Sequence, residues 1–463
     1  MSILGQAASA YRPDYPQPGW AEQSPALWED ALAPTIARAL DAAGVAAATV
    51  RALGVAGQLD GCIPTGPDGK ALGPCLIWMD RRAMREAEMI NADTLRAVSG
   101  VTRDASHMAA KIRWLKLHSP TARGATMFHQ PVSYLVSRLT GEAVFDHGLA
   151  STTMLYALES RDYSPALLKA FEIDRATLPA IADADSLAGR LSAEGAALSG
   201  LPKGLAVAVG TGDDFSSALG AGIHAPGRLV CVLGSAEVVG ALMADAAIDA
   251  AGLVETHSFP GGNFYIENPG WLSGGAVEWA CELFGLKDAA ALDARAAAVQ
   301  PGARGVSFLP ALTGAMAPEW VASARACFYG LTPAHGVGHM ARAILEGCSF
   351  AMVDVIARLR EMGAPLDAIR LLGGGANSRI WAQIRADCSG LPVELPVVGD
   401  TSPVGAAVLA AVAGGMRDDL AACADLVGAV AKTIDPNPAH RAAYDQAYGA
   451  YRRLFNSLRP MFR

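Results

Sequence analysis

The sequence predicts an α/β protein with two domains and a cleft between them. Segments with helical periodicity alternate with strand-like segments along the chain, which is typical of α/β folds. The 463 residues exceed the size at which a single hydrophobic core stops growing. The composition, with 52% hydrophobic and 18% charged residues, is that of a globular protein. Because clefts between domains favour ligand binding, we expect a site there.

The first half of the chain supplies the alternating elements. The pattern from Leu27 to Ala43 is helical, and the pattern from Ala47 to Val55 is strand-like. Gly66-Pro67-Asp68-Gly69 predicts a turn between strands at 61–65 and 72–78. Residues 79–180 are mostly helical in pattern, as in a cap-like insertion.

Three buried strands of the sequence end in loops that contain glycine. The strands and their loops are 205–209 with Gly210–Asp214, 229–233 with Gly234-Ser235, and 369–372 with Gly373–Gly375. The strand at 229–233 is followed by a return strand at 237–242, so these two strands form a hairpin. The Ala-rich stretch 288–299 predicts a helix. Because glycine has no Cβ, backbone N–H groups in such loops can approach a phosphate or a nucleotide. The sequence therefore predicts a cleft lined by all three loops.

Charge, cysteine and histidine patterns disfavour several functional classes. The net charge is −8 and no block of Lys or Arg is present, so neither nucleic acid nor a membrane surface is an expected partner. The eight cysteines form no Cys-x-x-Cys pair and lie mostly in apolar runs, which suits free thiols in a reducing cytosol. Without an apolar leader or a run of 18 uncharged apolar residues, we expect a soluble cytoplasmic protein. His107, His129 and His257 lack metal-ligand spacing, so we interpret them as structural and assign no metal ligand.

Two signatures carry a resemblance to a known family. The segment Ala326–Leu331, followed after seven residues by His339–Glu346, resembles the C-terminal signature of the FGGY carbohydrate kinases at every constrained position. Ser106–Leu115 is similar to the N-terminal signature, although Met108 stands where a small residue or proline is usual. Other segments follow in family order: Gly57–Gly61, Ile77–Arg82, Arg138–Glu142 and Gly210–Asp214. The resemblance spans essentially the whole chain and points to xylulokinase-like members.

The resemblance implies a fold, a reaction and cofactors. It implies a two-domain actin-like, ribonuclease H-like ATPase fold, with a sugar-binding domain at 1–217 and a nucleotide-binding domain at 218–463. It further implies transfer of the γ-phosphoryl group of ATP, with Mg²⁺, to a hydroxyl of a small ketose, and it allows a homodimer. A pentulose such as D-xylulose is the first expectation, with ribulose, erythritol or a non-catalytic sugar- or nucleotide-binding role as alternatives. A nicotinamide dehydrogenase is disfavoured because no Gly-x-Gly-x-x-Gly opens a helix.

Asp213 is the candidate catalytic base. It is the first aspartate after the Gly210-Thr211-Gly212 turn, and in similar kinases this residue accepts the proton of the sugar hydroxyl. The alternative is that Asp213 only caps the following helix. Asp214 replaces the amide that the family commonly has next, and it either raises the pKa of one member of the pair or binds a sugar hydroxyl.

The resemblance also assigns the nucleotide site. Gly234-Ser235 resembles the family's second phosphate loop, in which Ser keeps the hydroxyl of the usual Thr. Gly373, Gly374 and Gly375, with Asn377 and Ser378, resemble the adenosine loop, and a tight strand-to-helix turn is the alternative explanation of the three glycines. Gly274 and Glu278 are expected to form the opposite wall.

The candidate sugar contacts are Gln58, Leu59, Asp60, Trp78 and Asp80, besides Asp214. Xylulokinases have a Met-His pair where this chain has Leu59-Asp60, so the identity of the sugar stays open. Asp60 can accept two hydroxyls, which suits the recognition of a polyol. The alternative for Trp78, Asp80 and Arg82 is a surface salt bridge beside a core tryptophan.

Family members open with a β-hairpin whose Asp-x-Gly-Thr loop binds phosphates and helps to hold Mg²⁺, and this chain has no such motif. Met1 falls at what resembles the return strand, and Tyr15–Gln23 matches the segment after the hairpin. Either translation begins further upstream, or the protein lacks the loop and has another role, such as sugar sensing. If translation begins upstream, we expect the 463-residue form to be a poor catalyst with an exposed sheet edge.

Overall fold

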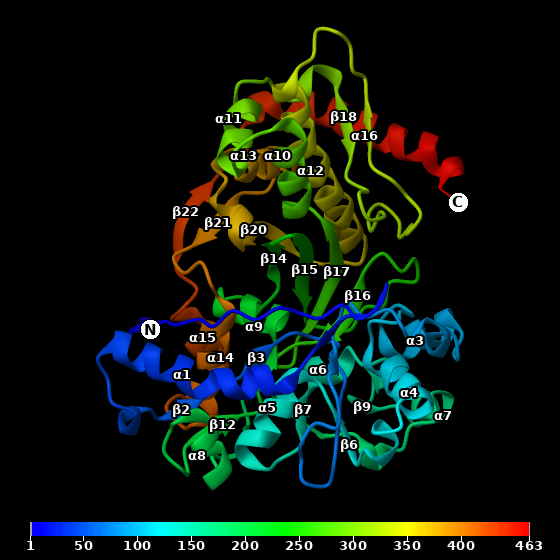
Figure 1. Ribbon diagram of the computed structural model, residues 1–463. Helices are drawn as coiled ribbons and strands as arrows, with labels where there is room; N and C mark the ends of the chain where they lie inside the picture. The colour runs from blue at the N-terminus through cyan, green and yellow to red at the C-terminus, as the bar shows by residue number, and fades with distance from the viewer. Residues whose placement is uncertain (1, 463) are drawn as a thin grey trace. The chain divides into compact units, whose positions relative to one another are not determined.

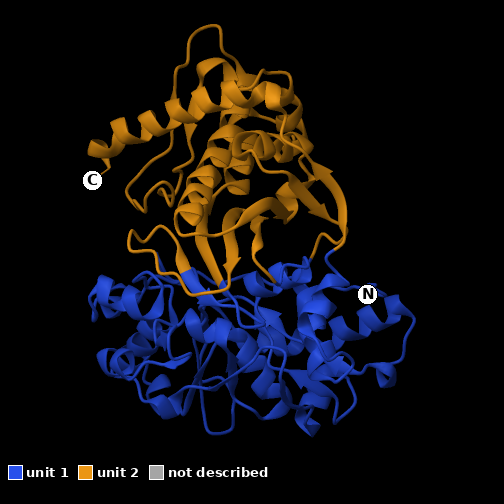
Figure 2. Cartoon of the chain, turned by 180° about the vertical axis from the view of Figure 1, so that it is seen from behind, with its two compact units in different colours: residues 1–224, 256–264, 401–428 blue, residues 225–255, 265–400, 429–463 orange. Residues whose placement is uncertain are grey.

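The computed structural model describes residues 2–462, which belong to two compact units (Figure 2). Unit 1 contains residues 1–224, 256–264 and 401–428, and unit 2 contains residues 225–255, 265–400 and 429–463. The boundary predicted between residues 217 and 218 is close to the first change of unit, after His224. Segments 256–264 and 401–428 return to unit 1, which differs from the single boundary that the sequence predicts. The sugar-binding and nucleotide-binding roles of the two halves stay predictions.

Unit 1 is built from short strands and helices (Figure 1). Its helices are α1 (Pro25–Ala43), α2 (Met84–Ala87), α3 (Ala92–Ser99), α4 (Met108–His118), α5 (Pro131–Thr140), α6 (His147–Ser151), α7 (Pro165–Ala170), α8 (Ala193–Ser199), α9 (Asp213–Gly220), α14 (Ser402–Ala413) and α15 (Leu420–Asp425). Its strands are β1 (Glu22–Gln23), β2 (Ala52–Leu53), β3 (Ala56–Gly57), β4 (Ile63–Thr65), β5 (Cys75–Leu76), β6 (Met127–His129), β7 (Val144–Asp146), β8 (Tyr156–Ala157), β9 (Asp162–Tyr163), β10 (Ala180–Ala182), β11 (Leu187–Arg190), β12 (Ala206–Ala208) and β13 (Thr211–Gly212).

Two parallel strand pairs determine the local geometry of unit 1. β12 pairs with β2, with Ala206 opposite Ala52, and β13 pairs with β3, with Thr211 opposite Ala56. The chain runs from β2 into β3 and from β12 into β13, so the two pairs follow one another in the same direction. The loops that leave β3 and β13 therefore start at the same edge.

Helix α14 belongs to unit 1 because its backbone packs directly on α9. A Cβ on Gly220 would lie 1.9 Å from the carbonyl oxygen of Thr401, and a Cβ on Gly405 would lie 2.0 Å from that of Ser216. The Ser216 hydroxyl also donates a hydrogen bond of 2.7 Å to the carbonyl oxygen of Ser402. Glycine at both helix surfaces allows this close contact, which joins segments that are far apart in the sequence.

Unit 2 contains most of a seven-stranded mixed sheet with the order β16-β17-β15-β14-β20-β21-β22 (Figure 1). The strands are β14 (Gly227–Leu233), β15 (Ala236–Met243), β16 (Glu255–Ser258), β17 (Phe264–Leu272), β20 (Leu366–Leu372), β21 (Val393–Pro396) and β22 (Val430–Ile434), and β18 (Ser307–Leu309) pairs separately with β19 (Cys327–Tyr329). The helices are α10 (Gly274–Phe284), α11 (Ala289–Ala297), α12 (Val337–Glu361), α13 (Arg379–Ser389) and α16 (Arg441–Leu458). β14 is antiparallel to β15 and parallel to β20, so β14 and β20 end at the same edge.

Most elements that the sequence predicts are present. The helix predicted at 27–43 is α1, the hairpin at 229–242 is β14–β15, and the Ala-rich segment 288–299 contains α11. The strand predicted over 47–55 is wrong in its first part, because Ala47–Thr49 is a 3-10 helix in which the Thr49 hydroxyl donates to the carbonyl oxygen of Ala46. Residues 79–180 contain the expected helices and also the short strands β6 to β9.

The first described residues do not form the expected return strand. Residues 2–13 have neither helical nor strand structure and lie along α1, where Arg38 donates a hydrogen bond of 2.8 Å to the carbonyl oxygen of Ala8. A Cβ on Gly5 would lie 2.3 Å from the carbonyl oxygen of Ala39. Met1, which was placed at this strand, lies outside the described residues.

None of the helices within residues 2–462 is long and apolar enough to cross a membrane. The cysteines are free thiols, and all except Cys327 are buried, as their apolar sequence surroundings predict.

Candidate active site

The loops after β3 and β13 come together in unit 1. The two strands are parallel neighbours, with Gly57 opposite Gly212, so their carboxyl ends meet. β3 continues into Gln58, Leu59 and Asp60, and β13 continues into α9, which begins at Asp213. The structure thus joins the predicted base to one group of predicted sugar contacts.

Close packing explains the two glycines that flank Thr211. Gly210 has a φ of 76°, and a Cβ there would lie 2.3 Å from the carbonyl oxygen of Val55. A Cβ on Gly212 would lie 1.9 Å from Cδ2 of Leu59. The Gly-Thr-Gly sequence therefore lets β13 approach β3 closely, and Leu59 has a packing role at this position.

Asp60, Asp213 and Asp214 form a group of acidic side chains that we call the carboxylate cluster. Burial raises the pKa of Asp213, although the backbone N–H groups of the first helical turn oppose part of this effect. Burial, and then the charges of Asp213 and Asp60, raise the pKa of Asp214 to about 8. At neutral pH Asp214 is therefore mostly protonated and can donate a hydrogen bond, as the amide usual in the family does.

Asp213 does not act as the cap of α9. The cap position is occupied by Gly212, and no side chain makes a capping hydrogen bond there. The alternative that Asp213 only caps the helix is therefore disfavoured, and its carboxylate is available for a ligand.

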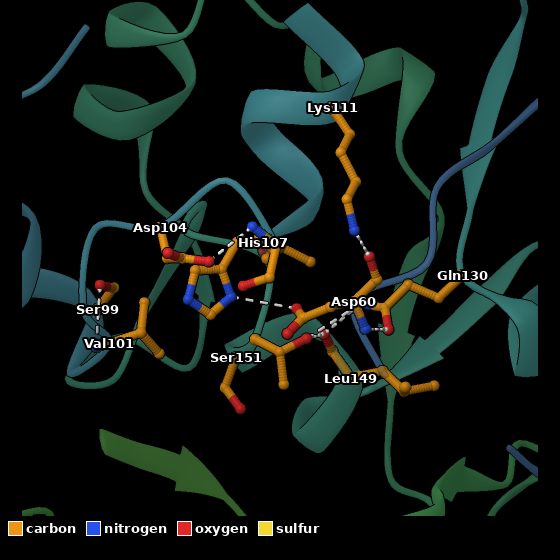
Figure 3. A network of polar contacts seen from close by, with 12 residues as sticks. Asp60, Ser99, Val101, Asp104, His107, Lys111, Gln130, Leu149 and Ser151 are labelled. Atoms are coloured by element: carbon orange, nitrogen blue, oxygen red, sulfur yellow. Dashed lines mark hydrogen bonds and ion pairs between the residues drawn. The ribbon is translucent and has the colours of Figure 1, made fainter. Parts of the chain in front are cut away.

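Three buried side chains hold Asp60 (Figure 3). Lys111 Nζ donates to the carbonyl oxygens of Asp60 at 2.6 Å and of Ile77 at 2.8 Å. Gln130 Oε1 accepts the backbone N–H of Asp60 at 3.0 Å, and His107 Nδ1 lies 3.1 Å from Oδ1 of Asp60. Lys111 and His107 lie within the segment 106–115 that resembles a family signature, but the sequence indicates no role in the site for Lys111, Gln130 or His107.

Asp146 holds β13 in position and was also missed. Its Oδ2 accepts a hydrogen bond of 2.8 Å from the Thr211 hydroxyl. Its oxygens also accept the N–H groups of Gly148 and Leu149, which caps α6. Burial raises the pKa of Asp146 to about 6 despite these donors. In the sequence, Asp146 cannot be distinguished from an ordinary helix cap.

The remaining predicted sugar contacts have other surroundings. Gln58 Nε2 donates to Gln23 Oε1 at 2.7 Å. Asp80 is fully buried, and its carboxylate accepts hydrogen bonds of 2.7 Å from the backbone N–H of Ala21 and from Arg82. The alternative that the sequence allows for these residues is a surface salt bridge beside a core tryptophan. The structure shows the reverse, because the Arg82–Asp80 salt bridge is buried and Trp78 is 45% exposed. We leave Asp80 out of the proposed site because both of its oxygens already have donors.

Unit 2 brings the predicted nucleotide loops together. The carbonyl oxygen of Gly234 accepts the N–H of Gly274 at 3.1 Å, and that of Ser235 accepts the N–H of Gly275 at 3.0 Å. A Cβ on Gly373 would lie 2.7 Å from the carbonyl oxygen of Leu233, and a Cβ on Gly375 would lie 2.3 Å from the Leu233 side chain. The loop at the tip of β14–β15, the start of α10 and the loop after β20 therefore meet around Leu233.

A pocket of about 760 Å³ lies beside the predicted adenosine loop and is lined in part by Gly373, Gly374, Asn377, Arg379 and Lys432. This volume is in the range of small-molecule and cofactor sites. Asn377 Nδ2 donates to the carbonyl oxygen of Gly374 at 3.1 Å, so the amide also stabilises the loop itself.

Two other predicted nucleotide contacts lie on helices. The Ser378 hydroxyl caps α13 by accepting the N–H of Trp381 at 3.2 Å. Glu278 is exposed on α10, one turn after Gly274. Both assignments to the nucleotide site stay predictions.

Residues 1–220 match the N-terminal domain of the FGGY family of carbohydrate kinases, and residues 229–414 match its C-terminal domain. The chain belongs to the FGGY family of carbohydrate kinases. This finding confirms the resemblance inferred from the two signatures. The FGGY kinase described here is therefore an ATP-dependent carbohydrate kinase.

Relatives of this FGGY kinase carry two different substrate names. A glycerol kinase from Aromatoleum aromaticum is 34% identical over 440 residues, which are 89% of this chain and 86% of the relative. A xylulose kinase from Escherichia coli is 30% identical over 454 residues, which are 96% of this chain and 92% of the relative. This chain also resembles the crystal structure of xylulose kinase from Rhodospirillum rubrum, with a TM-score of 0.89 and 30% sequence identity. The match covers 97% of this chain and 93% of the chain in that crystal structure. The predicted two-domain, actin-like α/β fold is confirmed.

Proposed function

We propose that this FGGY kinase phosphorylates a hydroxyl of a small ketose or polyol, with a pentulose such as D-xylulose as the first candidate. The carboxylate cluster carries this proposal. Asp213 lies at the start of α9, directly after β13, and Asp60 lies in the loop after β3, the strand that pairs with β13. Both are carboxyl groups that can accept hydrogen bonds from hydroxyl groups, which supports a base at Asp213 and a substrate contact at Asp60. A sugar or polyol offers several hydroxyls that can donate to such carboxylates.

In the proposed reaction Asp213 accepts the proton of the hydroxyl that is phosphorylated. Burial raises the pKa of Asp213 above that of an ordinary carboxyl group, which makes its carboxylate a stronger base. Protonated Asp214 donates a hydrogen bond to a substrate oxygen, and Asp60 accepts one from a second hydroxyl. Together these groups align one hydroxyl oxygen for in-line attack.

ATP supplies the γ-phosphoryl group. The glycine loops of unit 2 fit a nucleotide, because backbone is exposed at Gly234 and Gly374 and because the loop at 373–377 borders a pocket of suitable volume. We propose that Gly234, Ser235 and Gly274 lie next to the phosphates, and that Gly373 to Ser378 hold the adenosine. Residues 2–462 contain no group of three or more His, Cys, Asp or Glu side chains that could hold a metal, so we propose that Mg²⁺ enters with the phosphates of ATP.

Glycerol is the second candidate substrate. The relative from Aromatoleum aromaticum is named a glycerol kinase, and a glycerol-sized molecule also carries adjacent hydroxyls for Asp60 and Asp213. Ribulose and erythritol stay in the test set, since Leu59-Asp60 departs from the Met-His pair of xylulokinases. The cytoplasmic location and a homodimer stay predictions.

The decisive experiment has two readouts on the purified chain. ADP formation is followed in a coupled assay with D-xylulose, D-ribulose, glycerol, erythritol and ribitol, and binding of the same compounds is measured by calorimetry. We expect one compound to give ADP formation above the background ATPase rate, and we expect a kcat below the range of about 1–100 s⁻¹ usual for kinases if the 463-residue form is the poor catalyst that the sequence predicts. Binding without turnover would support the non-catalytic alternative, and neither binding nor turnover with any compound would contradict the proposal.

The matched variant is Asp213→Asn. Loss of the base should lower kcat by about 100-fold or more, whereas sugar affinity stays close to that of the unchanged protein, because the amide keeps the shape of the side chain. Asp445→Asn, in the exposed ion pair with Arg441, is the control for an Asp-to-Asn change and should leave kcat unchanged. A near-normal kcat in Asp213→Asn would refute the assignment of the base.

A further inference from the structure

Asp60 has an unusual backbone conformation. Its φ is 59°, in the left-handed region that residues other than glycine rarely occupy. Such a conformation costs free energy and persists when the surroundings fix it, as often happens at ligand sites. The conformation is therefore a reason to ask which groups hold Asp60, and for what purpose.

The backbone of Asp60 is held from both sides (Figure 3). Lys111 and Gln130 are each fully buried, and they bind the carbonyl oxygen and the N–H of Asp60, respectively. The orientation of the Gln130 amide is itself fixed, because its Nε2 donates to the carbonyl oxygen of Leu149 at 2.9 Å. Two buried polar side chains from α4 and the start of α5 therefore determine where the Asp60 side chain begins.

His107 determines the orientation of the Asp60 carboxylate. Its ring is buried, with 3% exposure, and Nδ1 lies 3.1 Å from Oδ1 of Asp60 (Figure 3). His107 occupies the cap position of α4 but makes no capping hydrogen bond with its side chain, so capping does not explain it. Asp104 is near the same ring: burial alone would raise the pKa of Asp104, but Arg81 and then His107 outweigh burial and lower it. The imidazole is thus placed between two carboxyl groups.

The second oxygen of Asp60 is left for a ligand. Among the hydrogen bonds of residues 2–462, none reaches Oδ2 of Asp60. This side chain is 16% exposed, and its charge acts on Asp214. One oxygen of Asp60 is therefore held by His107, and the other has no hydrogen bond from the described part of the protein, while the charge of the carboxylate is felt at Asp214.

We propose that His107 is a positioning residue that sets the substrate specificity of the kinase by holding Asp60, so that Oδ2 binds one particular hydroxyl of the sugar or polyol. This inference rests on the proposed function and goes beyond it, because it assigns His107 and names the chemistry that is selected. The preferred substrate has, besides the hydroxyl that is phosphorylated, a second hydroxyl that donates to Oδ2. Compounds that lack this hydroxyl cannot make the hydrogen bond to Oδ2, so they bind less tightly than the preferred substrate.

The test compares two substitutions of His107 that keep its size. His107→Phe keeps an aromatic ring but removes the nitrogen that contacts Asp60, whereas His107→Gln keeps a donor. We expect His107→Phe to raise the KM of the sugar by about 10- to 100-fold, in line with the loss of a hydrogen bond to a charged group, without changing the KM of ATP. His107→Gln should restore part of the loss. The preference for the best substrate over its deoxy analogues should fall most in His107→Phe and less in His107→Gln.

The control is His129→Gln. His129 is also buried and accepts or donates one hydrogen bond of 2.7 Å to Ser133, but it is not in the Asp60 network. The His129→Gln variant should have the same sugar KM and the same substrate selectivity as the unchanged protein. If His107→Phe fails to fold by circular dichroism, His107→Gln and sugar calorimetry decide the question alone.

The outcomes separate this inference from the proposed function. If the unchanged protein binds and phosphorylates none of the compounds, the proposed function fails. If the unchanged protein is active but both His107 variants keep its sugar KM and its selectivity, the function stands and the role of His107 is refuted. An equal rise in the KM of ATP and of sugar would also refute it, because a general structural defect would then be the cause.

Discussion

At the scale of single residues, Asp214 shows how neighbouring charges change the chemistry of a side chain. Its carboxyl group follows that of Asp213 on the first turn of α9 and is also close enough to Asp60 to sense its charge. Burial makes the charged form costly, and the two neighbours add repulsion. The pKa of Asp214 rises to about 8, so its protonation changes within the range in which enzymes are assayed.

The first prediction concerns Asp214→Asn. As pH rises through about 8, Asp214 in the unchanged protein loses its proton and adds a negative charge beside the base, so kcat/KM should fall above pH 8. Asparagine stays neutral, so this fall should be absent in the variant, whereas activity at pH 7 is retained. The measurement is a pH profile of kcat/KM for both proteins, and superimposable profiles would contradict the prediction.

The same shift has a consequence for stability. Because the folded-state pKa of Asp214 is raised, the folded protein binds this proton more tightly than the unfolded chain does, and the resulting stabilisation is lost as pH rises from about 4 towards 8. Asp214→Asn should therefore be more stable than the unchanged protein at pH 9, and the difference should shrink towards pH 4. Thermal unfolding at both pH values checks the sign.

The sequence predicts some of these residues and not others, for a physical reason. Asp213 follows directly from a buried strand and a glycine turn, both of which are local features. The pairing of His107 with Asp60 joins residues that are distant in the sequence, and no local pattern distinguishes it from an ordinary buried histidine. Asp80 was expected at the sugar because it follows a hairpin, but its carboxylate is occupied by Arg82 and by the N–H of Ala21.

At the scale of elements, a buried ion pair ties the β14–β15 hairpin to α13. Arg385 on α13 binds both oxygens of Glu237 on β15 at 2.5 and 2.7 Å, and both side chains are fully buried. Glu237 lies two residues after Ser235, and α13 begins one residue after Ser378. The pair therefore fixes the phosphate loop and the adenosine loop of the proposed nucleotide site to one another.

We predict that Glu237→Gln destabilises the protein strongly. It leaves the Arg385 charge buried without its partner, which typically costs about 3–5 kcal/mol of unfolding free energy. The exposed pair Arg441–Asp445 provides the control, since Asp445→Asn should cost about 0–1 kcal/mol. The double variant Glu237→Met with Arg385→Leu should recover most of the loss. Chemical denaturation measures the free energy of unfolding of Glu237→Gln, of Asp445→Asn and of the double variant. A loss of stability in Glu237→Gln no larger than in Asp445→Asn would contradict the prediction.

The elements themselves are predicted unevenly. Long periodic segments such as α1 and α11 are recognised because their apolar spacing repeats over several turns. The two-residue strands β2 and β3 carry too little pattern, and their existence depends on pairing with β12 and β13. The return of α14 to unit 1 depends on contact between Gly220, Gly405 and distant backbone, which no local pattern reveals.

At the scale of the whole molecule, each unit has a hydrophobic core of its own. The core of unit 1 includes Phe128, Val136 and Val207, and the core of unit 2 includes Leu229, Ile344 and Leu371. The proposed base lies in unit 1, and the proposed nucleotide loops lie in unit 2. Phosphoryl transfer requires the sugar hydroxyl and the γ-phosphoryl group to come into contact.

We therefore predict that ligands change the arrangement of the two units in solution. Units with separate cores can move as rigid bodies about the connecting segments, and contacts made by sugar and nucleotide together would favour a closed form. Small-angle scattering should show a smaller radius of gyration with the best sugar plus a non-hydrolysable ATP analogue than with either ligand alone. Asp213→Asn is the useful control, because it should bind both ligands without turnover and should contract with ATP itself. Scattering curves that are unchanged by saturating sugar and nucleotide, in protein shown by calorimetry to have bound both, would rule out such a closure.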